Sequence, residues 1–451
     1  MNNIDHIENI YFIGIGGIGM SALARFFKSQ GKNVAGYDKT ATELTKALVA
    51  EDIPVIYRDA VDAVPGEFLE DKESLIVYTP AVPKDHHQFE FFMNQDYVVI
   101  KRAALLGLVT RDRFTLAVAG THGKTTTTAI LAHLLKESNA EVTAFLGGIS
   151  EELNSNLMLN GDKVVVVEAD EFDRSFLHLS PNIAAITSMD ADHLDIYGVE
   201  EHLQASFRSF AGLVPKDGKL FVKNGLPLDG ITIGIEDDSD FTAVNIKVEN
   251  GAYRFDLETP NEVIKDLQFY LPGKHNLLNA ITALAMAITF GSPTEDIARA
   301  LYSFKGVKRR FTYKIKSENF VLIDDYAHHP AEIAAVYQAV REMHPGKKVL
   351  AIFQPHLYSR TRDFSDEFAA NLSKFEEVVL LDIYPAREKP IQGITSEWLL
   401  EKIDNEKKAL LAKEELYDKI KHSSAEVVVL MGAGDIGVEA EKLTKKFADE
   451  S

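Results

Sequence analysis

The residues best suited to chemistry lie in AGTHGKTTTT, Ala119 to Thr128, which follows an aliphatic run and opens a helix-like stretch. A glycine-rich turn at a helix N-terminus presents backbone N–H groups to phosphate, the lysine reaches the terminal phosphates, and a hydroxyl binds Mg²⁺. The pattern therefore predicts a phosphate-binding loop, although Val118 stands where the general motif has its first glycine. An ordinary strand-to-helix turn is the alternative. The candidate residues are Gly120, Thr121, His122, Gly123, Lys124, Thr125 and Thr126.

Two acidic clusters follow later aliphatic runs. EADEFD, Glu168 to Asp173, crowds four carboxylates, and DADH spans Asp190 to His193. Such crowding is costly unless a cation or a basic partner neutralises it. Carboxylate oxygens with one imidazole suit Mg²⁺ shared with nucleotide phosphates, so we expect Glu168 and His193 to bind the metal. Each cluster alone would more often be a solvated loop, but a phosphate-binding loop precedes both.

A second glycine-rich turn, GIGGIG, follows the first aliphatic run. Its spacing is that of a dinucleotide-binding turn, and Asp38 lies near the position expected for an acid that binds ribose. A nicotinamide-dependent oxidoreductase, the diphosphate of a UDP-sugar, and tight packing without a ligand all remain open. The candidate residues are Gly14, Gly16, Gly17, Ile18, Gly19, Asp38 and Thr79.

The last third carries two further polar clusters, DDYAHHP (Asp324 to Pro330) and FQPHLYSRTRD (Phe353 to Asp363), each after an aliphatic run. Their histidines and arginines could orient a ribose and a carboxylate substrate, because arginine forks suit carboxylates and phosphates. A single histidine of this kind is usually structural. GAGDIG, Gly432 to Gly437, suits a structural turn equally well.

Composition narrows the class of protein. The 451 residues carry a net charge of -20 and 46% hydrophobic residues, which predicts several soluble domains and argues against nucleic-acid binding. Cations gather only in KGVKRR, Lys305 to Arg310, and around Arg360 and Arg362. The absence of cysteine fits a reducing cytoplasm, and we expect no signal peptide and no membrane insertion.

Short aliphatic runs alternate with helix-like stretches along the chain, which predicts an α/β fold with parallel sheets covered on both faces. In such sheets ligands bind beyond the carboxyl ends of the strands, where these polar clusters lie. Between Gly225 and Pro272 shorter alternating runs predict a small antiparallel insertion. We expect three domains, at residues 1–107, 108–307 and 308–451.

These motifs together resemble the Mur ligase family over essentially the whole chain. The resemblance lies in GIGGIGMS, AGTHGKTTTT, EADEFDRSFLHL, DADHLDIYG, PGKHNLLNA, KRRF, DDYAHHP, FQPH with SRTRD, YPAR and GAGDIG, in this order. It implies that the first and third domains are Rossmann-like and that the second is a central P-loop-type ATPase domain. It also implies UDP-sugar binding by the first domain, ATP and Mg²⁺ binding by the second, with Mn²⁺ as a substitute, and a third domain that closes on ATP and the amino acid. Lys124, Glu168 and His193 are the expected catalytic residues, and Thr125, Glu168 and His193 the metal ligands.

The resemblance also implies further contacts. It assigns ATP to His275, Asn276, Asn279, Arg310, Asp324 and Asp325, and the amino acid to Tyr326, His328, His356 and Arg360. The implied reaction converts a carboxylate to an acyl phosphate with ATP and then joins it to an amine. Within the family the motifs are most similar to the branch that adds L-alanine to UDP-N-acetylmuramate in the cytoplasm, as a monomer or homodimer.

Two departures bear on this assignment. Leu357 stands where the family commonly has arginine after FQPH, which removes one expected contact to the amino-acid carboxylate. No lysine occurs between His193 and Lys216, whereas ligases of later steps carry a carbamylated lysine there, and this favours the alanine-adding branch. The alternatives are a recycling ligase that attaches a preformed peptide to the same sugar, the oxidoreductase named above, and a non-catalytic protein that binds ATP without turnover.

Overall fold

The computed structural model describes residues 4, 6–190, 197, 199–249, 251–386 and 388–449. These residues form two compact units and three sheets. Unit 1 comprises residues 1–244, 257–265 and 279–305, and unit 2 comprises residues 245–256, 266–278 and 306–451. Within the part of the chain that the structure describes, no helix combines the length and apolar composition needed to cross a membrane.

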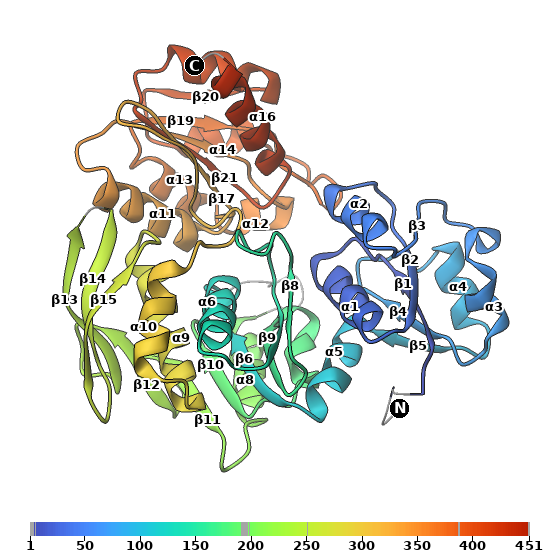
Figure 1. The fold of residues 1–451 in the computed structure, drawn as a ribbon. Helices are drawn as coiled ribbons and strands as arrows, with labels where there is room; N and C mark the ends of the chain where they lie inside the picture. Colours follow the sequence, from blue (N-terminus) through green and yellow to red (C-terminus); the bar gives the residue numbers. More distant parts are fainter. Residues whose placement is uncertain are drawn as a thin grey trace. The chain divides into compact units, whose positions relative to one another are not determined.

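The first sheet belongs to unit 1 and is parallel throughout, in the order β3-β2-β1-β4-β5 (Figure 1). The strand order reverses between β1 and β4, and this switch point is where open α/β sheets bind ligands. Its strands are β1 (Asn9–Ile13), β2 (Asn33–Tyr37), β3 (Val55–Ile56), β4 (Leu75–Tyr78) and β5 (Val98–Lys101). Its helices are α1 (Ile18–Ser29), α2 (Glu43–Ala50), η1 (Val61–Ala63), α3 (Gly66–Glu70), α4 (His87–Met93) and α5 (Arg102–Arg111).

The second sheet has ten strands in the order β15-β14-β13-β12-β11-β10-β6-β9-β7-β8. They are β6 (Phe114–Ala119), β7 (Val142–Phe145), β8 (Leu157–Asn160), β9 (Val164–Ala169), β10 (Ile183–Ile186), β11 (Lys219–Lys223), β12 (Ile231–Ile235), β13 (Phe241–Glu249), β14 (Ala252–Glu258) and β15 (Val263–Phe269). The associated helices are α6 (Lys124–Glu137), η2 (Phe172–His178), α8 (Glu200–Ala211), α9 (Lys274–Phe290) and α10 (Thr294–Ser303). Helix α6 packs on β6, β7 and β9, and α10 packs on α6 (Figure 1).

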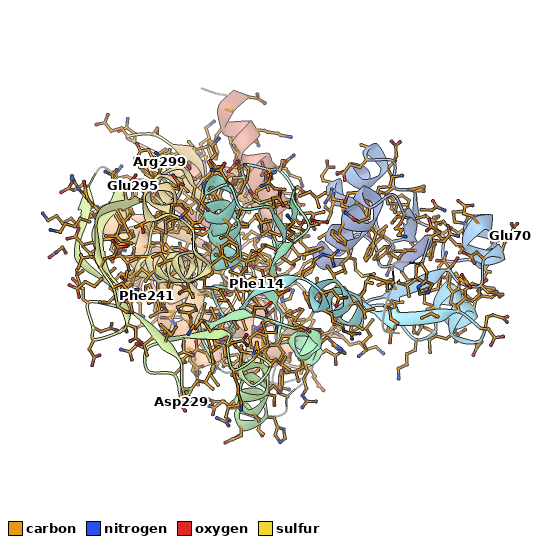
Figure 2. All side chains as sticks on the ribbon, turned by 60° about the horizontal axis from the view of Figure 1, so that its bottom comes forward. Glu70, Phe114, Asp229, Phe241, Glu295 and Arg299 are labelled. Atoms are coloured by element: carbon orange, nitrogen blue, oxygen red, sulfur yellow. The ribbon has the colours of Figure 1, made fainter. Side chains whose placement is uncertain are left out.

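The inserted strands extend this sheet. β12 pairs in parallel with both β11 and β13, so the first part of the predicted antiparallel insertion is parallel, whereas β8 runs antiparallel to β7 at the other edge of the sheet. Only two residues separate β13 from β14 in the chain, and neighbouring strands joined so closely must run antiparallel. Phe114, which is labelled in Figure 2, lies at the start of β6. Its ring is 5.7 Å from that of Phe290 on α9.

The third sheet lies in unit 2, in the order β16-β17-β21-β18-β19-β20. β16 runs antiparallel to β17, and the other pairs are parallel. The strands are β16 (Thr312–Lys316), β17 (Val321–Asp325), β18 (Val349–Phe353), β19 (Glu377–Leu380), β20 (Lys408–Leu410) and β21 (Val427–Met431). The helices are α11 (Pro330–Met343), α12 (Tyr358–Asp363), α13 (Ser365–Leu372), α14 (Ser396–Lys402), η3 (Lys413–Glu415), α15 (Leu416–His422) and α16 (Ile436–Asp449).

Unbroken aliphatic runs form the central strands of these sheets because both faces are covered there. On β17, Val321 and Ile323 join one buried apolar cluster and Leu322 joins another, on the opposite face. On β1, Phe12 and Tyr11 divide in the same way. The polar residues that follow each run are therefore held by strands that are themselves fixed from two sides.

Candidate active site

The predicted phosphate-binding loop joins β6 to α6. Gly120 and Gly123 have φ of +135° and +84°, a region that residues with a side chain rarely adopt. A Cβ at Gly120 would lie 2.2 Å from Thr187 Oγ1, and one at Gly123 would lie 2.4 Å from Asn279 Oδ1. Both glycines are therefore required by conformation and by space, and the loop ends at the first turn of a 14-residue helix.

Two residues after β10 hold this loop, and neither is among the predicted site residues. The hydroxyl of Thr187 donates to the carbonyls of Ala119 and His122. Ser188 Oγ accepts from His122 N at 2.7 Å and lies 2.9 Å from Thr121 Oγ1. The loop is thus braced on a neighbouring strand before any phosphate binds. Their position at the carboxyl end of the aliphatic run that forms β10 is the signal that could have identified them.

Lys124 lies in the loop with its ammonium group directed at acceptors. Its Nζ donates to Gly120 O at 2.5 Å and lies 2.8 Å from Glu171 Oε2. Burial works against the charged form, but the carboxylates of Glu171, Glu168 and Asp170 outweigh it and raise the pKa of Lys124. Burial raises the pKa of Glu171 to about 7, although Lys124 opposes the shift. Lys124 is therefore a buried cation at the loop.

Three carboxylates of the EADEFD segment have basic partners. Besides Glu171 with Lys124, Asp170 lies 3.4 Å from Arg102 and Asp173 lies 2.7 Å from Lys101. These partners explain how a buried strand tolerates so many acids. The sequence indicated the need for neutralisation, but not that residues 101 and 102 would supply it.

Glu168 is the remaining carboxylate. Its Oε2 is buried and has no hydrogen-bond partner among the described residues. A Cβ at Gly147 would come within 2.0 Å of that oxygen, so the loop after β7 packs its backbone directly against the carboxylate. An unsatisfied buried carboxylate oxygen is costly, and a cation would satisfy it. Thr125 is buried at the start of α6, while His193 lies outside the described residues.

The other predicted glycine turn, residues 14–19, lies at the switch point of the first sheet. A Cβ at Gly14 would lie 2.8 Å from Thr79 Cγ2, so these two predicted residues meet. Asp38 is close by, but its carboxylate closes the turn, because Oδ2 accepts from Gly16 N at 2.8 Å and Oδ1 accepts from Thr40 N at 3.1 Å. Asp38 therefore shapes the turn, in addition to any role toward a ribose.

Gly17 and Ile18 form the helix start beyond this turn. Gly17 is the N-cap of α1 and has no side-chain cap, and Ile18 is 37% exposed. Arg102 packs on the first turn, with Nη1 at 2.8 Å from the Cβ position of Gly19. The helix start thus carries a neighbouring guanidinium, which suits a diphosphate.

In unit 2, the predicted nucleotide contacts lie near the end of β17. Both oxygens of Asp325 accept backbone N–H groups at 2.7 Å, from Phe311 and Ala327. Burial raises the pKa of Asp325 to about 6, against the effect of Arg310 and these hydrogen bonds. The guanidinium of Arg310 lies 5.0 Å from the ring of Tyr326.

Two further predicted residues lie at the start of α9. Burial lowers the pKa of His275 to about 4, so the ring is neutral near pH 7. Asn276 Nδ2 donates to Pro272 O at 2.7 Å. An uncharged His275 imidazole therefore lies at the start of α9.

Asp324 differs from Asp325. Its Oδ1 lies 3.4 Å from Arg309 Nε, and Arg309 also donates to the carbonyls of Gly432 and Gly434. Gln354 holds the same turn, because its Oε1 accepts from Ile436 N at 3.0 Å. GAGDIG is thus a structural turn in this structure.

The four predicted amino-acid contacts form one cluster in unit 2. The ring of His328 lies 5.3 Å from that of Tyr326 and 6.0 Å from that of His356. Arg360 Nη1 lies 3.3 Å from His356 Nδ1, although the guanidinium is largely buried. Leu357, which replaces the family's arginine, is buried and has φ of +71°. The structure brings all four residues together, with an apolar side chain beside them.

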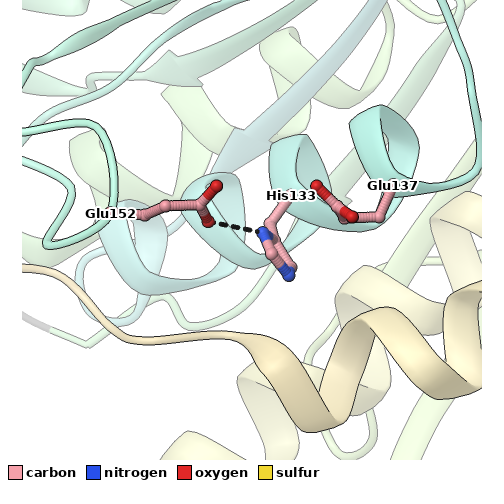
Figure 3. A group of neighbouring side chains, drawn as sticks. All are labelled: His133, Glu137 and Glu152. Carbon is pink, nitrogen blue, oxygen red and sulfur yellow. Dashed lines mark ion pairs between the residues drawn. The ribbon is translucent and has the colours of Figure 1, made fainter.

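A separate polar group joins α6 to the loop between β7 and β8. His133, Glu137 and Glu152 place ligand-type atoms close together, and His133 Nδ1 lies 3.0 Å from Glu152 Oε2 (Figure 3). Lys136 lies 2.8 Å from Glu152 and 3.3 Å from Glu137, so both carboxylates already have a cation. His133 Nε2 faces Ala300 O at 2.9 Å. The group ties α6 to α10, and we assign no metal to it.

A glycine-rich loop braced on a neighbouring strand, a buried lysine and an unsatisfied carboxylate, in a chain of three α/β sheets, form the arrangement expected of a nucleotide-dependent α/β enzyme. Family models match nearly all of the chain: "Mur ligase family, catalytic domain" at residues 9–114, "Mur ligase middle domain" at 118–287 and "Mur ligase, glutamate ligase domain" at 309–434. The chain belongs to the Mur ligase family.

Individual relatives agree with this. The chain is 66% identical to the UDP-N-acetylmuramate--L-alanine ligase of Christiangramia forsetii, over 100% of both chains. It resembles the crystal structure of the UDP-N-acetylmuramate-alanine ligase of Thermotoga maritima, with a TM-score of 0.83, 29% identity, and coverage of 98% and 100%. The murein peptide ligase of Psychrobacter arcticus shares the fold, with a TM-score of 0.70, 21% identity, and coverage of 97% and 98%.

Proposed function

We propose that this chain joins L-alanine to the carboxylate of UDP-N-acetylmuramate, with conversion of ATP to ADP and phosphate, in peptidoglycan precursor synthesis. The observation that carries the proposal is the buried Lys124 in a braced loop beside the unsatisfied Glu168 oxygen. The 66% identity to an alanine-adding ligase over the full length supports the choice of substrates. Family membership favours this reading over a nicotinamide-dependent oxidoreductase.

ATP would bind with its terminal phosphates on the loop between β6 and α6. Backbone N–H groups at the start of α6 and the Lys124 ammonium would hold the phosphate oxygens. We assign nucleotide contacts in unit 1 to Gly120, Thr121, His122, Gly123, Lys124, Thr125, Thr126 and Asn279. In unit 2 we assign them to His275, Asn276, Arg310, Asp324 and Asp325, following the family resemblance.

We assign the Mg²⁺ ligands to Thr125, Glu168 and His193. The donor set fits, because a hydroxyl and a carboxylate are hard oxygen ligands and Glu168 Oε2 needs a partner. When bound, Mg²⁺ would supply positive charge to the phosphates, and Mn²⁺ would substitute for it. The sugar nucleotide is assigned to Gly14, Gly16, Gly17, Ile18, Gly19, Asp38 and Thr79.

The reaction balances in two steps. A carboxylate oxygen of the sugar substrate attacks the γ-phosphorus of ATP, the bond to the β-phosphate oxygen breaks, and an acyl phosphate and ADP form. The neutral amine of alanine then attacks the acyl carbon, phosphate leaves, and the nitrogen loses a proton. Lys124 would neutralise charge on the transferred phosphoryl group, and the rigid loop would align it for attack.

Alanine is the amino acid we propose, bound by Tyr326, His328, His356 and Arg360. Arg360 would pair with its carboxylate, without a second arginine at position 357. Serine, glycine and the preformed peptide of a recycling ligase are the competing acceptors. We place the enzyme in the cytoplasm, where ATP and UDP-sugars are made, as a monomer or homodimer. Sedimentation velocity distinguishes these two states.

The test measures phosphate release from ATP and Mg²⁺ with UDP-N-acetylmuramate, across L-alanine, L-serine, glycine and the recycled peptide, with the product identified by mass spectrometry. We expect release only when sugar nucleotide and amino acid are both present, and the highest kcat/KM with L-alanine. Turnover with the peptide and not with alanine would assign the recycling reaction. Phosphate release at the same rate with and without the sugar nucleotide would overturn the proposal.

A further inference from the structure

Asn156 is a completely buried amide in the loop between β7 and β8, outside every motif described above. Its Nδ2 donates to Ile18 O and, at 2.9 Å, to Ser21 Oγ, both in the first turn of α1. Its Oδ1 accepts from Arg25 Nη1 at 2.5 Å. The amide thus uses both donors and its acceptor on one helix.

Arg25 is itself fixed. Its guanidinium makes two bonds to Glu51 at the end of α2, Nε to Oε2 at 2.6 Å and Nη2 to Oε1 at 2.8 Å. Ser21 Oγ donates to Gly17 O at 3.0 Å, which links the network to the N-cap of α1. A buried network with its polar groups satisfied is rigid, so the glycine turn at residues 14–19 has a fixed position relative to Asn156.

The same loop reaches the other ligand site through its backbone. Leu146 N donates to Asn156 O at 2.9 Å, and the next residue is Gly147. The missing side chain of Gly147 lets this backbone lie against the Glu168 carboxylate. Asn156 therefore contacts the start of α1 through its side chain. Through the backbone of Leu146 and Gly147 it is also linked to Glu168, the proposed metal ligand.

We infer that Asn156 is a positioning residue that holds the sugar-binding turn of α1 in register with the phosphate-transfer site at Glu168. This inference rests on the proposed function, because it concerns the alignment of the sugar carboxylate with the γ-phosphate of ATP. Asn156 touches neither substrate in this account. Its effect is on the rate from the bound complex, since transfer depends on a near-attack geometry that small displacements disturb.

The experiment compares steady-state kinetics of the full chain with Asn156→Ala and Asn156→Asp. The alanine variant removes all three side-chain bonds, whereas the aspartate variant keeps the acceptor for Arg25 and removes both donors. Asn160→Ala is the matched control, because Asn160 lies on β8 of the same hairpin and donates only to Ala140 O at 3.0 Å. Binding of a non-hydrolysable ATP analogue counts the folded sites in each preparation.

We expect kcat per folded site to fall about tenfold or more in both variants, with the KM for ATP changed by less than about twofold. Asn160→Ala should match the native chain. A purely structural role predicts fewer folded sites with native kcat per site, and that result in both variants would overturn the inference alone. If the native chain does not ligate alanine to UDP-N-acetylmuramate, the proposed function and this inference fail together.

Discussion

The two glycine-rich turns of unit 1 share a strand-turn-helix setting but differ in what surrounds them. The turn at residues 120–123 leads into Lys124 and lies beside the Glu171 and Glu168 carboxylates. The turn at residues 14–19 has no lysine, and its acid, Asp38, accepts a hydrogen bond from the turn's own backbone. Glycine spacing therefore indicates where a phosphate can approach the backbone, while the neighbouring charged residues indicate whether the phosphate is transferred or only bound.

The turn at residues 432–437 in unit 2 extends the contrast. There Arg309 and Gln354 use the turn's carbonyl and N–H groups, and Asp435 pairs with Lys413 at 2.5 Å. The three turns have similar glycine-rich sequences but different surroundings. The turn at residues 120–123 lies beside the buried Lys124, the turn at residues 14–19 is closed by the Asp38 carboxylate, and the turn at residues 432–437 is held by Arg309 and Gln354. The contrast can be tested by substitutions.

The largest effect is expected at Lys124. Lys124→Ala should lower kcat for ligation by about 10³-fold or more, because it removes the cation beside the transferred phosphoryl group. Phosphate release with saturating substrates measures it. Lys136→Ala, in the same helix but paired with Glu137 and Glu152, is the control and should remain near native. Near-native turnover of Lys124→Ala would contradict the proposal that the turn at residues 120–123, and not the turn at residues 14–19, supports phosphoryl transfer.

The second effect compares one glycine from each turn. Gly123→Ala forces a left-handed alanine and a Cβ 2.4 Å from Asn279 Oδ1, which costs about 1–3 kcal/mol and should lower kcat/KM for ATP by about tenfold or more. Gly17 has φ of -66°, and its nearest contact from an added Cβ is 3.5 Å. Gly17→Ala should therefore leave kcat/KM for ATP unchanged. Equal losses in both variants would contradict the contrast.

A smaller effect is expected at Asp38. Asp38→Asn replaces one carboxylate oxygen with an N–H donor, so either Gly16 N or Thr40 N loses its acceptor. The KM for UDP-N-acetylmuramate should rise about threefold to tenfold, while the affinity for an ATP analogue stays constant. Asp62→Asn, an exposed surface change in the same domain, serves as control. A changed ATP affinity with native sugar KM would reverse the assignment of the two turns.

The smallest effect concerns pH. Because the folded-state pKa of Glu171 is raised from 4.5 to about 7, the folded chain holds this proton to higher pH than the unfolded chain. This group's contribution to stability therefore falls as pH rises through that window. Glu171→Gln has no titrating group at this position, so its stability does not carry this pH dependence. The free energy of unfolding of Glu171→Gln should therefore increase relative to that of the native chain as the pH rises from about 5 to about 8. Urea unfolding at both values measures it, and a pH-independent offset would contradict it.

Much of the fold follows from the sequence because buried strands need continuous aliphatic residues. Among the short aliphatic runs of the sequence, VLIDD (321–325), VLAIF (349–353) and VVVLM (427–431) coincide with β17, β18 and β21 residue for residue. YFIGI does not, since the strand ends at Ile13, where Gly14 turns with φ of +89°. Lys124 and the cluster around His328 were identifiable because their side chains follow strands directly.

The remaining site residues could not be predicted, because their partners are distant in the chain. Glu171 pairs with Lys124, 47 residues away, and Asn156 bonds to Arg25, 131 residues away. The acidic EADEFD motif indicates that a cation is needed, but the partner in either pairing cannot be read from the sequence, since it depends on how the elements pack in the finished fold. Buried polar networks of this kind are apparent only in three dimensions.

The close contact between the Gly147 backbone and Glu168 restricts which residues can occupy position 147. Even a methyl group there would meet the Glu168 oxygen at 2.0 Å, so no substitution leaves the carboxylate where it is. A ligand that hydrogen-bonds to the main chain at this glycine would contact a position where any added side chain displaces the Glu168 carboxylate.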